Sequence, residues 1–79
     1  MSAALTAQIA LISAIKTLTE AGVDGAPRDA RRLMAFALGI APDRLTLHLQ
    51  DPLSQEAEGR FAAAISARAA RHPVSHITG

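Results

Sequence analysis

The chain has 79 residues, of which 49% are hydrophobic and 19% are charged, and its formal net charge is +1. This length fits one small domain and excludes a second. The apolar content excludes a disordered tail, because the chain can bury enough surface to offset the entropy of ordering. A domain this short buries only about 60% of the surface that its unfolded chain exposes, which leaves no room for a large active-site pocket.

Composition also narrows the fold class and the cellular location. Alanine and leucine are frequent and strand-forming residues are few, which predicts an all-α domain. Cysteine is absent, which excludes a disulfide framework and a thiolate metal site and favours the cytoplasm over secretion. Residues 1–15 are uncharged, but they are too few to span about 30 Å of hydrocarbon and lack the basic start of a signal peptide. We therefore expect no membrane partner.

The apolar spacing predicts a small orthogonal bundle of four to five helices. The first is expected over residues 3–21, and Gly22 supplies the left-handed residue that ends it. Two i, i+4, i+7 runs make its apolar stripe, namely Leu5, Ile9, Ile12 and Leu11, Ile15, Leu18.

The second helix is predicted over residues 27–38. Pro27 suits the first helical position, and Asp29 lies in the first turn, where the helix dipole favours an acid. Phe36 and Leu38 add so much apolar surface that the last turn is expected to be covered on most sides. Gly39 is the residue expected just after the helix. The predicted core stripe consists of Ala30, Leu33, Met34 and Ala37.

Residues 45–50 alternate between apolar and polar, as in a half-buried strand, but no other segment could pair with such a strand. A short helix over residues 42–48 is therefore preferred. A fourth helix is predicted over residues 54–71 with Ser54 as its N-cap. Pro73 can open a last short helix over residues 73–77. The fourth helix is expected to face inward with Ala57, Phe61, Ala64, Ile65 and Ala69.

Metal binding and catalysis find little support in the residue pattern. His72 and His76 are four apart and His48 could join them, but Pro73 interrupts the helix that would align the pair, and no carboxylate lies at ligand spacing. The histidines are interpreted as surface or packing residues. No glycine-rich phosphate loop and no supported Ser/His/Asp arrangement occurs, so we predict neither catalytic nor cofactor-binding residues within this chain.

Arginine supplies seven of the eight basic residues, and its planar guanidinium suits bidentate recognition of carboxylate or phosphate. At 100° per residue Arg60 and Arg71 lie about 20° apart, with Arg68 near the edge of the same face. Such clusters serve as a docking surface for an acidic partner, as an ordinary solvated face, or as a nucleic-acid surface. The candidate partner-binding residues are Arg28, Arg31, Arg32, Arg60, Arg68 and Arg71.

Two segments together carry a family resemblance. Residues 26–39, APRDARRLMAFALG, look like the P-R-x-D-A-x-x-L-L-x-x-x-L-G helix of the N-terminal domain of release factor glutamine N5-methyltransferases. Residues 68–79, RAARHPVSHITG, are similar to the R-R-x-x-x-E-P-[LIV]-x-[YH]-[IL]-x-G junction of that family. Three departures occur. Arg31 and His72 stand where the family usually has glutamate, and Arg68 and Arg71 are spaced apart where the family usually has an adjacent arginine pair.

The resemblance implies a two-domain cytoplasmic enzyme whose small helical N-terminal domain precedes a Rossmann-like methyltransferase domain. Such enzymes transfer a methyl group from S-adenosylmethionine to the glutamine of the Gly-Gly-Gln motif in class I peptide chain release factors. The cofactor glycines and the Asn-Pro-Pro-Tyr motif belong to the C-terminal domain and are absent from residues 1–79. We therefore expect residues 1–79 to be an excised substrate-recognition domain that docks the release factor.

Two other functions remain open at this level. A small DNA-binding module would place residues 27–38 in the major groove, although the C-terminal half of that helix is apolar, whereas a recognition helix keeps an exposed polar face. An intramolecular scaffold would instead pack exposed apolar positions, including Val74 and Ile77, on the catalytic domain.

Overall fold

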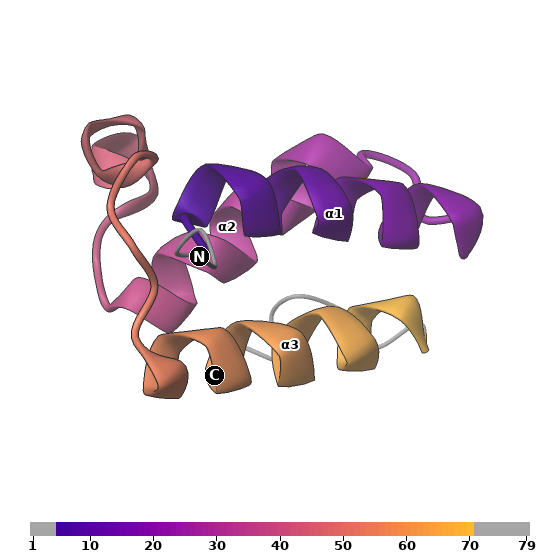
Figure 1. The fold of residues 1–79 in the computed structure, drawn as a ribbon. Helices are drawn as coiled ribbons and strands as arrows, with labels where there is room; N and C mark the ends of the chain where they lie inside the picture. Colours follow the sequence, from indigo (N-terminus) through magenta and orange to yellow (C-terminus); the bar gives the residue numbers. More distant parts are fainter. Residues whose placement is uncertain (1–4, 71–79) are drawn as a thin grey trace.

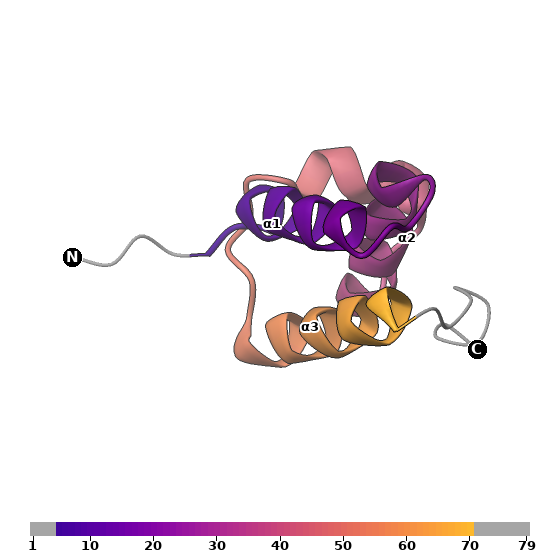
Figure 2. The same ribbon diagram turned by 90° about the vertical axis from the view of Figure 1, so that its right-hand side faces the viewer.

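The computed structural model describes residues 5–70, which form four helices and contain no β-strand. They are α1 (Ala7–Glu20), α2 (Ala26–Leu38), the 3₁₀ helix η1 (Pro42–His48) and α3 (Gln55–Ala69). In Figure 1, α1 and α3 run in the same direction, while α2 crosses behind α1 and ends beside the start of α3. Figure 2 shows the three α-helices as the corners of a triangle around one core. The predicted all-α bundle is confirmed, and the helix predicted over residues 73–77 lies outside the described residues.

Helix α1 begins at Ala7, four residues later than predicted, because Thr6 is its N-cap. The Thr6 hydroxyl accepts a hydrogen bond from the Ile9 amide at 3.2 Å. The amides of Ala7 and Gln8 donate to the carbonyls of Asp51 (3.2 Å) and Leu49 (2.9 Å) in the segment between η1 and α3. The first amides of a helix lack partners inside it, so this distant segment determines where α1 can start.

The buried face of α1 differs from the predicted apolar stripe. Ile9 and Ile12 are 50% and 61% exposed, so placing them in the core was wrong. Alanine permits closer approach of neighbouring helices than isoleucine does, and the alanine-rich stripe of α1 is the one that packs inward. The residues that α1 buries are Ala7, Ala10, Leu11, Ala14 and Leu18.

Helix α2 buries all four residues predicted for its core, and each has 3% or less of its surface exposed, as do Ala26 and Ala35. The helix starts at Ala26, one residue before the predicted Pro27. The last turn is covered on most sides, as expected, since Ala35 and Ala37 are buried and Leu38 packs against the core. Phe36 is the exception and is 43% exposed.

Gly39 ends α2 in the left-handed conformation, with φ of 71°. Its amide donates to the Phe36 carbonyl, and the Ile40 amide donates to that of Ala35, which is the paired arrangement of a glycine-terminated helix. A Cβ built on Gly39 would have nothing within 4 Å. We therefore expect Gly39→Ala to lower the free energy of unfolding by about 1 kcal/mol through backbone strain alone.

Urea denaturation followed by circular dichroism measures this cost. Gly59→Ala is the matched control, because Gly59 lies inside α3, has open space around its Cβ position and no positive φ. That substitution is expected to stabilise the chain by roughly 0.5–1 kcal/mol. Changes of equal size and the same sign in the free energy of unfolding of both variants would contradict the assignment of backbone strain to position 39.

The third and fourth predicted helices are confirmed. Residues 42–48 form a helix with the predicted bounds, wound as a 3₁₀ helix, and only Leu45 within it is buried. Ser54 caps α3 and accepts the Ala57 amide at 3.1 Å. Helix α3 ends at Ala69, two residues before the predicted end, and it buries Ala57, Phe61, Ala64 and Ile65 as expected.

Candidate protein interface on helix α2

Arg68 and Asp29 join the C-terminal end of α3 to the first turn of α2. The Arg68 Nε donates to Asp29 Oδ2 at 2.9 Å, and the two side chains are 21% and 5% exposed. Asp29 is the one charged residue that the described part of the chain buries. An ion pair with so little solvent access requires this charge-assisted hydrogen bond to offset the desolvation of the carboxylate. Arg68 therefore serves the fold of the domain.

Arg60 serves the fold at the opposite end of α2. Its Nε and Nη2 both donate to the Ala37 carbonyl, at 3.1 and 2.9 Å. The last carbonyls of a helix have no partner inside it and carry its negative dipole end, so a guanidinium is stabilising there. Arg60 also lies 3.9 Å from the exposed Glu56. Both described arginines of α3 are thus engaged with α2, and Arg71 lies outside the described residues.

The three predicted arginines of α2 have different surroundings. Arg31 donates to the Thr46 hydroxyl at 3.2 Å and so connects α2 to η1. The Arg28 side chain is 77% exposed and lies 4.0 Å from Asp29, whose other oxygen binds Arg68. Arg32 is exposed, and no hydrogen bond or ion pair joins it to another described residue. Arg28 and Arg32 are the two with their hydrogen-bonding capacity largely available.

Phe36 extends the surface that Arg28 and Arg32 form. The three residues lie at i, i+4 and i+8, which at 100° per residue places them within about 80° on one face of α2. We call them the α2 ridge. The fully buried residues Ala30, Met34 and Ala37 lie about 140–160° from the middle of the ridge by the same measure, so the ridge lies on the side of α2 opposite its core residues. The arginine prediction left Phe36 out of the site, although its spacing from Arg28 and Arg32 was available in the sequence.

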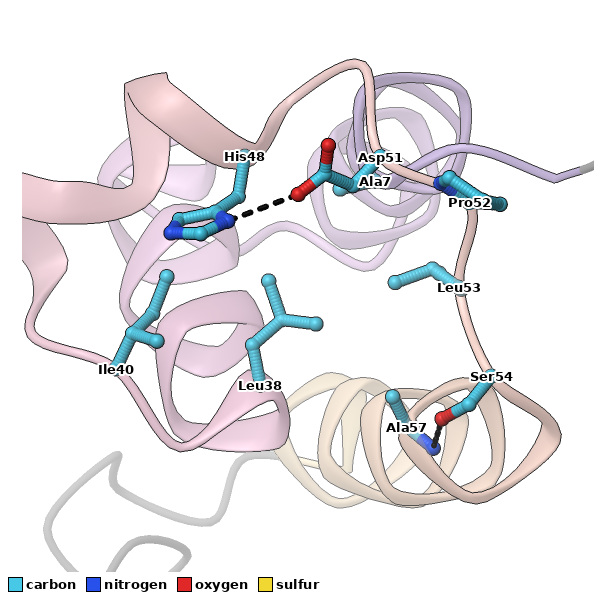
Figure 3. A pocket seen from close by; sticks show the side chains of 9 residues that line it. All are labelled: Ala7, Leu38, Ile40, His48, Asp51, Pro52, Leu53, Ser54 and Ala57. Carbon is cyan, nitrogen blue, oxygen red and sulfur yellow. Dashed lines mark hydrogen bonds and ion pairs between the residues drawn. The ribbon is translucent and has the colours of Figure 1, made fainter.

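A small cavity lies where the segment after η1 passes the start of α3 (Figure 3). It measures about 260 Å³. His48 Nδ1 and Asp51 Oδ2 lie 2.9 Å apart at its wall, and the Ser54 hydroxyl is engaged with the Ala57 amide. The remaining lining is apolar, and it consists of Ala7, Leu38, Ile40, Pro52, Leu53 and Ala57. One imidazole–carboxylate pair beside a single, already engaged hydroxyl group does not make an activated nucleophile.

The described residues contain no group of three or more histidine, cysteine, aspartate or glutamate side chains that could hold a metal ion, and His72 and His76 lie outside them. None of the helices within residues 5–70 has the length and apolar character needed to cross a membrane. The α2 ridge, with its exposed arginines and phenylalanine, is accordingly the candidate functional surface in this part of the chain.

Comparison with known proteins identifies the family. The family model described as the PrmC N-terminal domain matches residues 10–79. The chain belongs to the PrmC N-terminal domain family. No solved structure matches it.

Curated relatives of this PrmC N-terminal domain carry the name release factor glutamine methyltransferase. The protein from Cereibacter sphaeroides is 60% identical over 70 residues, which cover 89% of this chain and 25% of the relative. The protein from Corynebacterium glutamicum is 41% identical, with 95% and 25% covered. The protein from Moorella thermoacetica is 35% identical, with 95% and 26% covered. The chain thus spans about a quarter of the length of these relatives.

The resemblance noted in the sequence is therefore confirmed, and the PrmC N-terminal domain structure explains part of it. Asp29 belongs to the first of the two resembling segments and Arg68 to the second, and the two side chains form the buried ion pair. One residue from each resembling segment thus contacts the other in the fold.

Proposed function

We propose that this PrmC N-terminal domain recognises a class I peptide chain release factor for an S-adenosylmethionine-dependent glutamine methyltransferase in the cytoplasm. It binds the release factor while a C-terminal catalytic domain methylates the glutamine of the Gly-Gly-Gln motif. The α2 ridge is the observation that carries this proposal, because its arginines are exposed and its phenylalanine is unburied. The names of the curated relatives supply the substrate class.

The composition of the α2 ridge favours a protein partner. Arginine and aromatic side chains are enriched at protein interfaces, where an aromatic ring supplies contact area and guanidinium groups pair with carboxylates. A DNA-binding helix would instead continue its polar face to the end of the helix, whereas Phe36 occupies the last turns of the ridge. Such a surface contributes by holding the whole substrate close to the active site. It takes no part in the chemical step itself.

Neither hollow in the described residues favours cofactor binding. Pockets for ligands of that size enclose about 300–1,000 Å³, and the cavity beside His48 measures only about 260 Å³. The larger groove between α1 and α3, about 540 Å³, is open to solvent and has Glu58 as its one ionisable residue. We therefore assign S-adenosylmethionine binding and the methyl transfer to the C-terminal domain, and recognition to this one.

Deleting residues 1–79 from the full-length enzyme tests the proposal. We expect kcat/KM for the intact release factor to fall at least about tenfold, equivalent to about 1.4 kcal/mol of lost binding, chiefly through KM. A short peptide containing Gly-Gly-Gln is the control substrate, because it cannot reach both domains, and both proteins should methylate it at equal rates. Unchanged kinetics with the intact factor would contradict recognition. Equal losses of kcat/KM with the intact release factor and with the peptide would show that the domain acts as a scaffold for the catalytic domain.

A further inference from the structure

A second surface lies on the side of the molecule opposite the α2 ridge. Helices α1 and α3 run in the same direction in Figure 1, and α2 passes behind α1. The ridge lies on the side of α2 opposite the core residues that face these helices. Figure 2 shows the same relation from the side. Between α1 and α3 the structure has an open groove of about 540 Å³. The domain therefore presents two separate faces.

The groove is mainly apolar, and many of its lining side chains are small, with hydroxyl groups from Ser13, Thr17 and Ser66. Glu58 is its one ionisable residue. Ala10 and Ala14 contribute from α1 and Ala62 from α3, and Ile9 borders the groove with half of its surface exposed. Small side chains on two parallel helices leave the hollow into which the side chains of a third helix can pack at an interaxial distance of about 8–10 Å.

We infer that this groove is occupied by an aliphatic face of a helix from the catalytic domain that follows this domain in the full-length enzyme, an inference that rests on the proposed function. The curated relatives are about four times as long as their matched segment, which covers 25% of the Cereibacter sphaeroides protein. The remainder follows the N-terminal domain. Helix α3 forms one wall of the groove, and its last residue, Ala69, is part of the lining.

Charge and tethering both favour this occupant over the release factor. A tethered helix binds intramolecularly, at a high effective concentration. A groove with modest apolar contacts and little charge is therefore sufficient to hold it. A free protein must find its site by diffusion and gains from exposed charge. The α2 ridge has two exposed arginines, whereas Glu58 is the one charged residue of the groove. A substrate on the ridge and a catalytic domain on the groove would bind without competing.

Site-specific photocrosslinking in the full-length enzyme tests the inference. Benzoylphenylalanine replaces Ala62, which lines the groove, or Ala63, its exposed neighbour on α3 that does not. Neither residue is buried, so both variants keep the core. We expect irradiation of the enzyme alone to join position 62 to peptides beyond residue 79 within a single chain, and we expect this product to be lost at position 63.

Each other product would overturn the inference in a recognisable way. Crosslinked dimers from position 62 would show that a second copy occupies the groove. Crosslinks that form only after a release factor is added would assign the groove to the substrate. Equal yields at positions 62 and 63 would show an unoccupied groove. Because the decisive reaction contains no release factor, its failure is distinct from a failure of the recognition function.

Discussion

Replacing Arg68 with methionine is expected to lower the free energy of unfolding of the 79-residue chain by about 3 kcal/mol. The substitution keeps the length of the side chain but removes the donor 2.9 Å from Asp29 Oδ2. The carboxylate stays 95% buried, and its other neighbour, Arg28, is 4.0 Å away and largely in solvent. Removing one partner of a buried pair costs roughly 3–5 kcal/mol because the remaining charge is uncompensated. Urea denaturation followed at 222 nm measures the change.

A double variant separates the ion pair from other effects of the substitution. Adding Asp29→Leu to Arg68→Met removes the buried charge as well, so most of the lost stability should return. Arg32→Met is the matched control, because it makes the same substitution at an exposed arginine, and it should change stability by less than about 0.5 kcal/mol. A double variant as unstable as the Arg68 variant would contradict the assigned role.

Reversing the charge of Arg32 is expected to reduce kcat/KM of the full-length enzyme for a release factor by about tenfold. Arg32→Glu converts the most available cation of the α2 ridge into a repulsive group facing an acidic partner, which slows association. The loss should appear mainly in KM. Adding Arg28→Glu should deepen it further. Because exposed charges are screened by salt, the difference from the wild-type enzyme should shrink at about 0.5 M NaCl.

Lys16→Glu provides the matched control for this reversal. Lys16 is exposed on α1, away from the α2 ridge, and its substitution changes the net charge by the same amount. It should leave the kinetics within about twofold, since remote surface charges act weakly at physiological salt. Phe36→Ala adds a test of the apolar part of the ridge and should raise KM without altering the salt dependence. A Lys16 variant as impaired as the Arg32 variant would attribute the loss to overall charge.

The parts of the fold that sequence predicted well are those set by local chemistry. Gly39 at the end of α2 and Ser54 at the start of α3 act through contacts within a few residues. The start of α1 was placed too early because its first amides bond to carbonyls more than 40 residues away. The exposure of Ile9 was missed for a similar reason. Periodicity identifies apolar faces, but packing between helices decides which face is buried.

The sequence predicted the residue type of the candidate site, arginine, but not the role of each arginine. The sequence placed Arg60 and Arg68 in one class with Arg32, because all three are arginines on helices. In the fold, Arg60 meets the end of α2, Arg68 meets Asp29, and Arg32 meets solvent. Which guanidinium finds an internal acceptor depends on how α3 lies against α2, and that relation is not local in the chain.

The contacts of Arg60 and Arg68 also specify the alignment of two helices. Residues 29 and 37 of α2 are eight apart, as are residues 60 and 68 of α3, and the contacts pair 29 with 68 and 37 with 60. The alanines along this boundary would tolerate sliding. A slip of one turn, about 5.4 Å, would separate both guanidinium groups from their acceptors at once. The two arginines thereby select a single antiparallel register of α3 against α2. The apolar residues between these helices would by themselves allow more than one register.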